Sequence, residues 1–379
     1  MRRRLALPEP ALGEDLPMTQ TPAKADRDAE LSTAEKQLYE DFNRFGLIPL
    51  WTEREDLMPM TPAPQAVPHV WHWDDLYPLA ARAGDLIPVG RGGERRAISV
   101  SNPGLPGLPY ATPTLWAAIQ YLGPNEVAPA HRHSQNAFRF VLEGEGVWTV
   151  VDSDPVAMRR GDLLLTPGWQ FHGHHNPHPK PMAWLDGLDI PFVAATDTGF
   201  FEFGEDGVTD RSTPHRSRSE RIWGHPGLRP LAATATDTPN SPLAAYRWEH
   251  TDAALTAQLE VAAEGHPGVV TEPGHAAVRF SNPTTGGDAL TTIRTEMHRI
   301  AAGERTAAVR ETGSSVWQVF DGTGAITLDG KRTDLVRGDV IAVPSWCEVA
   351  IEARTDLDLF RFSDAPIFER LNLARREYS

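Results

Sequence analysis

An internal repeat is the feature of this 379-residue sequence that most constrains its fold. Three short patterns from the middle of the chain return in the same order, offset by about 177–180 positions. The patterns are Ser101-Asn102-Pro103 with Ser281-Asn282-Pro283, Glu143-Gly144-Glu145-Gly146 with Asp321-Gly322-Thr323-Gly324, and Arg160-Gly161-Asp162 with Arg337-Gly338-Asp339. Chance recurrence of turn residues could explain one match but not three in order, so we expect two copies of one small domain.

Each copy is rich in short apolar runs that are separated by turn residues. Runs such as 138–143, 147–151 and 163–166 have the length and composition of strands. The 31 glycines and 33 prolines are too many for a helix bundle and suit many short strands. The sequence therefore predicts an all-β protein with two barrel-like domains.

Changes in sequence texture along the chain predict six segments. A capping box, Ser32 with Glu35, begins a helix that Gly46 ends. The expected segments are a disordered N-terminal tail (1–31), a helical and irregular arm (32–95), a first barrel (96–203), a linker with a short helix (204–263), a second barrel (264–365) and a C-terminal tail (366–379).

Charge and cysteine content exclude several function classes. The 51 acidic residues exceed the 36 basic ones, and the net charge of −15 argues against nucleic acid or an anionic membrane as a partner. The single cysteine, Cys347, excludes an intrachain disulfide framework. No apolar run has the length of a membrane span. We expect a cytoplasmic protein.

Histidines are concentrated in the first copy. Six of the 14 histidines lie between His131 and His178. His131 and His133 are separated by one residue on an extended segment, so both imidazoles point to the same face. His172 follows the turn pattern of the same copy. Three histidines at this spacing inside a barrel pattern favour a metal site over structural histidines.

These positions resemble the two motifs of the cupin superfamily. The first motif, G-x5-H-x-H-x3,4-E-x6-G, is met except that Asn125 replaces the leading glycine and Ala137 the glutamate. The second, G-x5-P-x-G-x2-H-x3-N, is met with a tryptophan in its second glycine position; its residues here are Gly161, Pro167, Trp169, His172 and Asn176. The resemblance implies a bicupin: two jelly-roll-type β-barrels behind an N-terminal helical arm, with one divalent metal held by His131, His133 and His172.

The lost glutamate and the second copy refine this prediction. Three imidazoles leave about three positions free in an octahedral metal shell, enough for a chelating substrate and dioxygen. In the second copy Val309, Glu311 and Val349 stand opposite the three histidines, so we expect no metal there. His298 lies nearby but is a poor basis for a second site.

Two segments narrow the resemblance to one bicupin family. Residues 131–146 and 181–191 resemble the gentisate 1,2-dioxygenase family, which includes dioxygenases of salicylates and of 1-hydroxy-2-naphthoate. The resemblance implies Fe(II) on the three histidines and a homotetramer. It also implies substrate-contacting or supporting roles for a further set of residues: Trp116, Gln120, Arg139, His174, Asp186, and Arg91 and Arg95 from the arm.

Strand alternation agrees with several of these roles. Arg139 lies at even spacing from His131 and His133, so it would point into the barrel, where it could bind a substrate carboxylate or a protein carboxylate. Trp116, Ala118 and Gln120 share one face and would form a slot whose width Ala118 could set.

The remaining positions leave more than one interpretation open. His174 could be a hydrogen-bond partner or an acid/base near a phenolic oxygen. Asp186 could orient His174 or contact a distal hydroxyl. Arg91 and Arg95 flank flexible glycines and could cover the cavity mouth, or be ordinary surface arginines.

The preferred interpretation is an Fe(II)-dependent dioxygenase. It would cleave the ring of a 2-hydroxybenzoate between the carboxyl-bearing and hydroxyl-bearing carbons, with gentisate giving maleylpyruvate as the leading case. The same chemistry on salicylate, a 5-substituted salicylate or 1-hydroxy-2-naphthoate is an alternative. A zinc hydrolase or isomerase, or a non-catalytic ligand-binding bicupin, are more distant alternatives.

Overall fold

A computed structural model describes residues 31–87, 96–204, 214–232 and 236–378, apart from the side chains of 53–56. Its contacts divide the chain into two units, Met1–Met60 and Thr61–Ser379. The described part of the first unit contains helix α1 (Thr33–Arg44) and helix α2 (Leu50–Leu57). No helix in the described ranges is long and apolar enough to cross a membrane.

Helix α1 begins and ends as its sequence predicts. The Ser32 side chain accepts a hydrogen bond from the Glu35 backbone N–H, and the Glu35 carboxylate accepts one from the Ser32 N–H. Gly46, just after the helix, has a left-handed φ of 66°. The capping-box prediction is confirmed.

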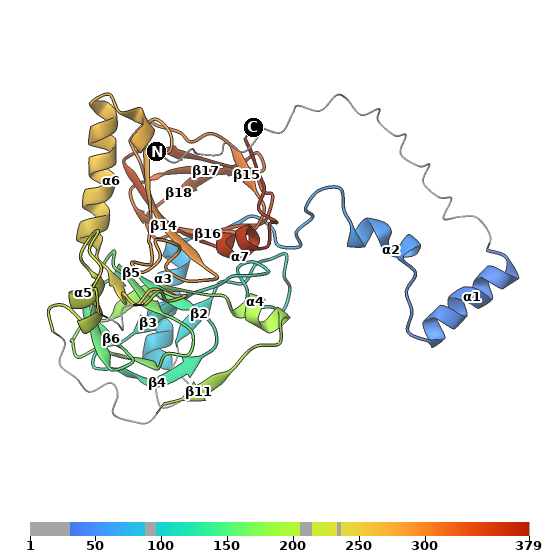
Figure 1. Ribbon diagram of the computed structural model, residues 1–379, viewed down its shortest axis with the longest axis horizontal. Helices are drawn as coiled ribbons and strands as arrows, with labels where there is room; N and C mark the ends of the chain where they lie inside the picture. Colours follow the sequence, from blue (N-terminus) through green and yellow to red (C-terminus); the bar gives the residue numbers. More distant parts are fainter. Residues whose placement is uncertain (1–30, 88–95, 205–213, 233–235, 379) are drawn as a thin grey trace. The chain divides into compact units, whose positions relative to one another are not determined.

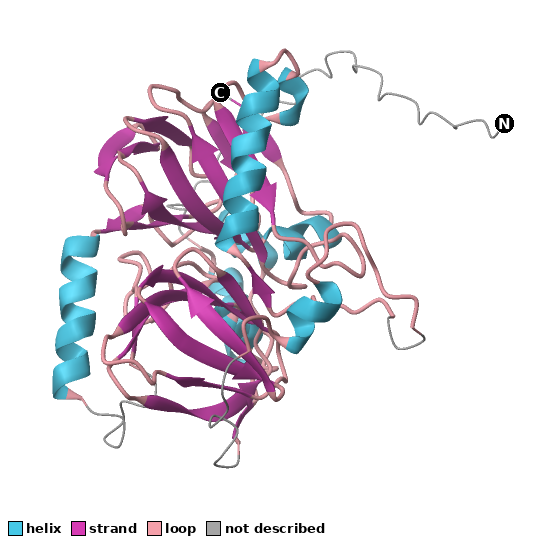
Figure 2. Ribbon diagram, turned by 90° about the vertical axis from the view of Figure 1, so that its left-hand side faces the viewer, coloured by secondary structure: helices cyan, strands magenta, loops and turns pink. Residues whose placement is uncertain are grey.

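The second unit contains two β-barrels, each made of two sheets (Figures 1 and 2). In the N-terminal barrel the six-stranded sheet has the order β12-β8-β5-β10-β3-β2, and the five-stranded sheet the order β11-β4-β9-β6-β7. The strands are β2 (Ala97–Ser99), β3 (Trp116–Leu122), β4 (Val127–His133), β5 (Ala137–Glu143), β6 (Glu145–Val151), β7 (Asp154–Arg159), β8 (Leu163–Thr166), β9 (His172–His175), β10 (Met182–Leu188), β11 (Phe201–Phe203) and β12 (Ala245–Tyr246).

The C-terminal barrel repeats this arrangement. Its sheets have the orders β1-β19-β16-β21-β14-β13 and β18-β17-β20-β15-β22. The strands are β1 (His69–Trp71), β13 (His275–Arg279), β14 (Arg294–Ile300), β15 (Val309–Glu311), β16 (Ser315–Asp321), β17 (Gly324–Leu328), β18 (Lys331–Leu335), β19 (Val340–Val343), β20 (Val349–Ala353), β21 (Leu357–Ser363) and β22 (Arg376–Tyr378). The duplication and the all-β bicupin class are confirmed.

Helices connect and flank the barrels. Helix α3 (Trp73–Leu86) packs on β3, and helix α6 (Trp248–Ala263) packs on β13 and β14. Short helices lie elsewhere in the chain: α4 (Ile190–Ala195), α5 (Arg218–Trp223), α7 (Ala365–Arg370) and the 3-10 turn Pro267–Val269. The segment 204–263, expected as a linker with one short helix, contains the two helices α5 and α6 in its described part.

Each barrel takes one strand from the segment that precedes the other barrel. β1 lies before the N-terminal barrel in sequence but pairs with β19 of the C-terminal barrel. β12, which lies within the expected linker segment (204–263), pairs with β8 of the N-terminal barrel. The two exchanges are reciprocal, so neither barrel is a continuous piece of chain. The six sequence ranges therefore remain a proposal about domain boundaries.

The repeated Arg-Gly-Asp turns hold these exchanged segments. Asp162 accepts a hydrogen bond of 3.0 Å from the backbone N–H of Trp248, the first residue of α6. Asp339 accepts an equivalent 3.0 Å bond from Trp73, the first residue of α3. Both glycines have positive φ, and a side chain on Gly161 or on Gly338 would collide with the tryptophan. The repeat therefore marks the positions where each barrel receives its exchanged strand and helix.

One hydrophobic core joins the two six-stranded sheets. Phe138 and Phe140 of β5 contact Phe360 and Phe362 of β21, and the rings of Phe140 and Phe360 stack at 4.1 Å with an interplanar angle of 6°. All four side chains are fully buried. Burial of these aromatic rings between the two sheets holds the barrels together.

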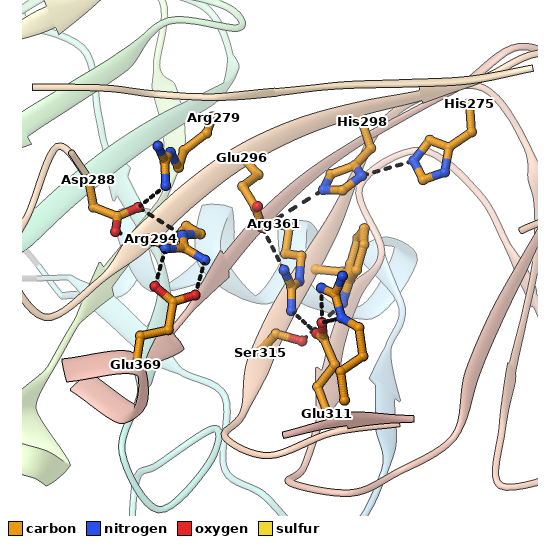
Figure 3. Close-up of polar contacts among 12 residues, drawn as sticks. His275, Arg279, Asp288, Arg294, Glu296, His298, Glu311, Ser315, Arg361 and Glu369 are labelled. Atoms are coloured by element: carbon orange, nitrogen blue, oxygen red, sulfur yellow. Dashed lines mark hydrogen bonds and ion pairs between the residues drawn. The ribbon is translucent and has the colours of Figure 1, made fainter. Parts of the chain in front are cut away.

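A charged network lies inside the C-terminal barrel (Figure 3). Arg361 donates hydrogen bonds to Glu296 at 2.6 Å and to Glu311 at 2.7 Å. Arg376 also bonds Glu311. Burial raises the pKa of the Glu296 carboxyl, but the charges and hydrogen bonds of Arg361 and His298 together lower it far below its usual range. This carboxylate is therefore charged throughout the physiological range.

We predict that Glu296→Gln lowers the free energy of unfolding by about 1–3 kcal/mol at pH 7, because Arg361 loses one of its two half-buried counter-charges and the charged hydrogen bond to it. The carboxyl pKa is lowered in the folded state, so its contribution is complete above the unfolded pKa near 4.5 and is lost as the pH falls toward the folded value. The difference between variant and wild type should shrink below about pH 4.5.

Urea unfolding at pH 7 and at pH 4 would measure both effects. Glu352→Gln is the control, because that glutamate is half exposed and faces Arg332 at 3.8 Å on the surface. An equal loss of stability in the two variants would contradict the prediction.

Candidate metal centre

Two adjacent strands of the N-terminal barrel bring three histidines together. His131 and His133 alternate with Arg132 on β4, so both point inward. β4 pairs antiparallel with β9 in a register that places His172 opposite His131. The ring centroids of His172 lie 4.4 Å from His131 and 4.9 Å from His133. One candidate ligand atom from each histidine lies within 4.8 Å of the others.

Backbone carbonyls determine which nitrogen each of these histidines presents. The Nδ1 atoms lie 3.1, 2.9 and 3.0 Å from the carbonyl oxygens of Pro129, Gln135 and Gln170. A carbonyl oxygen only accepts, so each Nδ1 must carry the hydrogen. In the neutral imidazole each Nε2 is then unprotonated, which is the state that a metal ligand requires.

The electrostatic environment of His172 agrees with this. Its side chain is fully buried, and its Nε2 has no hydrogen-bond partner among the described residues. Burial first, and then the charge of Arg139, lower the pKa of His172 well below its usual value. Three neutral imidazole nitrogens suit iron, zinc or copper, so this donor set fits a divalent transition metal.

The departures from the cupin motifs have a geometric explanation. Asn125, in the leading glycine position, has φ = 57°, a left-handed conformation that asparagine tolerates. Trp169, in the second glycine position, has φ = 71°, and its counterpart Trp346 has φ = 66°. The backbone N–H of Trp169 donates to the His133 carbonyl at 2.7 Å, which anchors the strained turn beside the site.

A cavity of about 500 Å³ lies beside the three histidines. Its lining includes most of the positions expected from the sequence: Trp116, Gln120, His131, His133, Arg139, His174 and Asp186. Ala137, which replaces the motif glutamate, also lines it and offers no ligand atom. Ala118 is fully buried and is absent from the lining, although it pairs with Asp186 across β3 and β10.

Arg139 lies against a protein carboxylate inside the barrel. Its Nε is 3.4 Å from Asp186 Oδ1, and its Nη1 donates to Thr166 Oγ1 at 2.9 Å. Trp184 Nε1 donates to the same Asp186 oxygen at 3.0 Å. Burial raises the pKa of the Asp186 carboxyl to about 6, while Arg139 opposes the shift. Of the two partners expected for Arg139, the structure shows a protein carboxylate, Asp186. The same arginine also lines the cavity, where a substrate carboxylate could reach it.

His174 is one of the residues that line the cavity. It is two residues beyond His172 on β9 and packs on the Trp184 ring at 5.3 Å. Its Nε2 has no hydrogen-bond partner among the described residues. Burial, followed by the charge of Arg139, lowers the pKa of His174 well below its usual value. A neutral imidazole with one unused ring nitrogen therefore borders the cavity.

Some site positions lay beyond sequence reasoning or lie outside the described residues. Arg91 and Arg95 fall within 88–95, outside the described residues. Several lining residues had not been expected: Ala97, Ala128, Gln135, Leu188, Ile190, Gly199, Phe200 and Phe201. Phe200 and Phe201 reach the cavity because β11 pairs with β4 in a register that sets Phe201 opposite His133. No local pattern marks that pairing.

The C-terminal barrel has no equivalent histidine group in the described part of the chain. Val309 pairs with Val349, in the register that His131 and His172 share in the first barrel. This pairing confirms the alignment inferred from the repeat. His298 does have a histidine neighbour that the sequence analysis missed, since its Nδ1 lies 3.0 Å from His275 Nε2. His275 comes from β13, which pairs with β14.

A fold of two cupin-type barrels with a three-histidine group beside a cavity defines a cupin metalloprotein. Residues 118–188 match the cupin domain family. The chain is 67% identical over 339 residues to a gentisate 1,2-dioxygenase from Streptomyces sp., covering 89% of this chain and 94% of that protein. It is 33% identical to a 5-aminosalicylate 1,2-dioxygenase from Comamonas sp., covering 90% and 89%.

Solved structures agree with this assignment. A salicylate 1,2-dioxygenase from Pseudoaminobacter salicylatoxidans, determined with gentisate, superposes with a TM-score of 0.90 at 57% identity, covering 93% of this chain and 96% of that one. The chain belongs to the gentisate 1,2-dioxygenase family, and it is a ring-cleaving dioxygenase.

We predict one bound transition metal per chain, and its loss on replacing any one of His131, His133 or His172 with alanine. Two imidazoles hold a divalent ion too weakly to survive dialysis. Elemental analysis of dialysed protein would measure the stoichiometry. Replacement of His275 with alanine is the control and should leave the metal content unchanged. Two metals per chain, or full metal content in any of the three variants, would contradict the prediction.

Proposed function

We propose that this protein is an Fe(II)-dependent dioxygenase that opens the ring of a 2-hydroxybenzoate between the carboxyl-bearing and hydroxyl-bearing carbons. Gentisate is the proposed substrate and maleylpyruvate the product. The observation that carries the proposal is the three-histidine group beside a cavity of about 500 Å³ that contains one buried arginine. High identity to a gentisate 1,2-dioxygenase supports the choice of substrate.

The proposed metal ligands are the Nε2 atoms of His131, His133 and His172. Ala137 offers no fourth protein ligand, so a metal held by the three histidines would keep coordination positions for substrate oxygens and dioxygen. Fe(II), when bound, supplies the redox chemistry that joins dioxygen to the ring. The chain's own residues position the substrate and exclude water.

Arg139 is the proposed carboxylate-binding residue. Its guanidinium lies deep in the cavity, where a charged hydrogen bond is stronger than in water. Asp186 holds this guanidinium in place from the side. Trp116 and Gln120 lie on the same face of β3, and we propose that they form a flat wall and an amide contact for the ring.

The names of the relatives define which other substrates deserve a test. One relative is a 5-aminosalicylate 1,2-dioxygenase, another a 1-hydroxy-2-naphthoate dioxygenase, and the structural relative a salicylate 1,2-dioxygenase. The substrates in these names share an aromatic ring that carries adjacent carboxylate and hydroxyl groups. The substituents on the rest of the ring are the feature that a substrate panel would resolve.

Oxygen uptake by protein reconstituted anaerobically with Fe(II) is the direct test. Gentisate, salicylate, 5-aminosalicylate and 1-hydroxy-2-naphthoate would be offered separately, with Zn²⁺-loaded protein as the control. We expect uptake with gentisate and formation of maleylpyruvate, and none with Zn²⁺, which is redox-inert. No uptake with any acid despite bound iron would refute the proposal, and uptake without gentisate turnover would refute the choice of substrate.

We predict that Arg139→Ala raises the KM for gentisate about 10–100-fold, because a charge-assisted hydrogen bond contributes about 1.5–3 kcal/mol. The bound iron should remain, since Arg139 touches none of the three ligands in the described contacts. Steady-state kinetics and elemental analysis separate the two effects. Arg139→Lys keeps the positive charge but lacks the planar guanidinium, so its KM for gentisate should lie between those of the wild type and Arg139→Ala. Loss of iron in Arg139→Ala would assign this arginine a structural role instead.

We also propose a cytoplasmic location and a homotetramer. The single cysteine supports a reducing compartment, and family resemblance supports the tetramer. Light scattering should give four times the chain mass of 41.7 kDa.

A further inference from the structure

A buried threonine lies directly opposite His174. Thr149 on β6 pairs with His174 on β9, and both side chains are shut off from solvent. Thr149 Oγ1 lies 2.8 Å from His174 Nδ1. Thr149 Oγ1 also lies 3.2 Å from Met158 Sδ, in donor geometry toward the sulfur. The three side chains therefore form a short polar chain behind the cavity.

The number of hydrogens in this chain determines the state of His174. A thioether sulfur can accept a hydrogen bond but has nothing to donate, and the threonine hydroxyl has a single hydrogen. When that hydrogen points to Met158, the Thr149 oxygen is free to accept from His174 Nδ1–H. The contacts of Thr149 with Met158 and with His174 are then both hydrogen bonds. If the hydroxyl hydrogen pointed to His174 instead, the sulfur of Met158 would face only the lone pairs of the threonine oxygen. This arrangement predicts a hydrogen on Nδ1 of His174 and an unprotonated Nε2.

The second barrel provides an internal comparison. The strand registers place Ile326 and Ile351 where Thr149 and His174 stand, because Ile326 pairs with Ile351 as Thr149 pairs with His174. Leu335 takes the place of Met158. Met158 lies two residues after Val156, the partner of Thr149, and Leu335 lies two residues after Thr333, the partner of Ile326. All three replacements are buried and aliphatic. The fold does not need the polar chain, which occurs in the barrel with the three-histidine group.

We propose that Thr149, backed by Met158, is a positioning residue that holds His174 in the Nδ1–H tautomer, so that Nε2 accepts a hydrogen bond from a substrate hydroxyl or amino group. The proposal rests on the proposed function in so far as the ligand is an aromatic hydroxy acid. A buried acceptor without a donor is unfavourable, so the site discriminates against ligands that offer none. His174 lines the cavity, and the packing of its ring on Trp184 restricts the orientation of the imidazole.

The tautomer can be measured without turnover. Protein labelled with ¹⁵N-histidine and loaded with diamagnetic Zn²⁺ would give the nitrogen shifts of His174, assigned by their loss in His174→Gln. We expect a protonated Nδ1 and an unprotonated Nε2 in the wild type. In Met158→Leu, which removes the acceptor of the threonine hydrogen, we expect a shift toward the Nε2–H form. A protonated Nε2 in the wild type would overturn the proposal.

Kinetics test the consequence for substrate. Thr149→Val keeps the shape without the hydroxyl and should lower kcat/KM for gentisate about tenfold, with the metal content unchanged. Thr149→Ser keeps the hydroxyl and should stay within about twofold of the wild type. Thr295→Val is the matched control, because Thr295 is a fully buried threonine on β14 whose hydroxyl has no hydrogen-bond partner among the described residues.

The outcomes separate this proposal from the proposed function. Equal kcat/KM in wild type and Thr149→Val at equal metal content would overturn the positioning role. An equal loss in Thr149→Ser and Thr149→Val would also overturn it, because the hydroxyl would then not be the cause. A third outcome is a protein in which His174 has the expected tautomer but which turns over none of the aromatic acids. This outcome would support the tautomer assignment and refute the proposed function.

Discussion

The register between β4 and β9 is the constraint on which the rest of the site depends. It places His172 opposite His131 and leaves His174 facing Thr149 on the neighbouring strand. Antiparallel pairing cannot slip by one residue without turning each of these imidazoles to the other face. The turn before β9 is held by the bond from Trp169 to the His133 carbonyl. The left-handed backbone at Trp169 recurs at Trp346, so this strained turn belongs to the duplicated scaffold, and in the first barrel it fixes the strand that carries His172.

The two barrels solve the same packing problem with different interior electrostatics. In the first barrel, three histidine side chains lie close together, and Arg139 with Asp186 forms a separate charged pair. In the second, Glu311 stands in the position of His133, and the guanidinium of Arg361 lies between Glu296 and Glu311 (Figure 3). A covalently attached cation satisfies these carboxylates, so the duplicated scaffold persists without the ligand set.

Much of this arrangement could be predicted from local patterns. The repeat predicted two barrels, alternation around His131 and His133 predicted an inward-facing pair, and Ser32 with Glu35 predicted the start of α1. The exchange of β1 and β12 between barrels could not be predicted, because each of these strands has three or fewer residues and pairs with a partner far away in sequence. Phe201 and His275 reach their sites through such long-range pairings.

The sequence by itself determined the duplication, the all-β class, the candidate ligands and the loss of those ligands in the second copy. These features can be read from residue types and from their spacing in short stretches of the chain, without knowing which strands pair. Only the tertiary structure decided which nitrogen each histidine presents, how Arg139 and Asp186 share the barrel interior, and that Thr149 and Met158 stand behind His174. Those contacts join strands whose side chains meet only after the sheets have closed, and hydrogen-bond direction depends on atoms that no local pattern brings together.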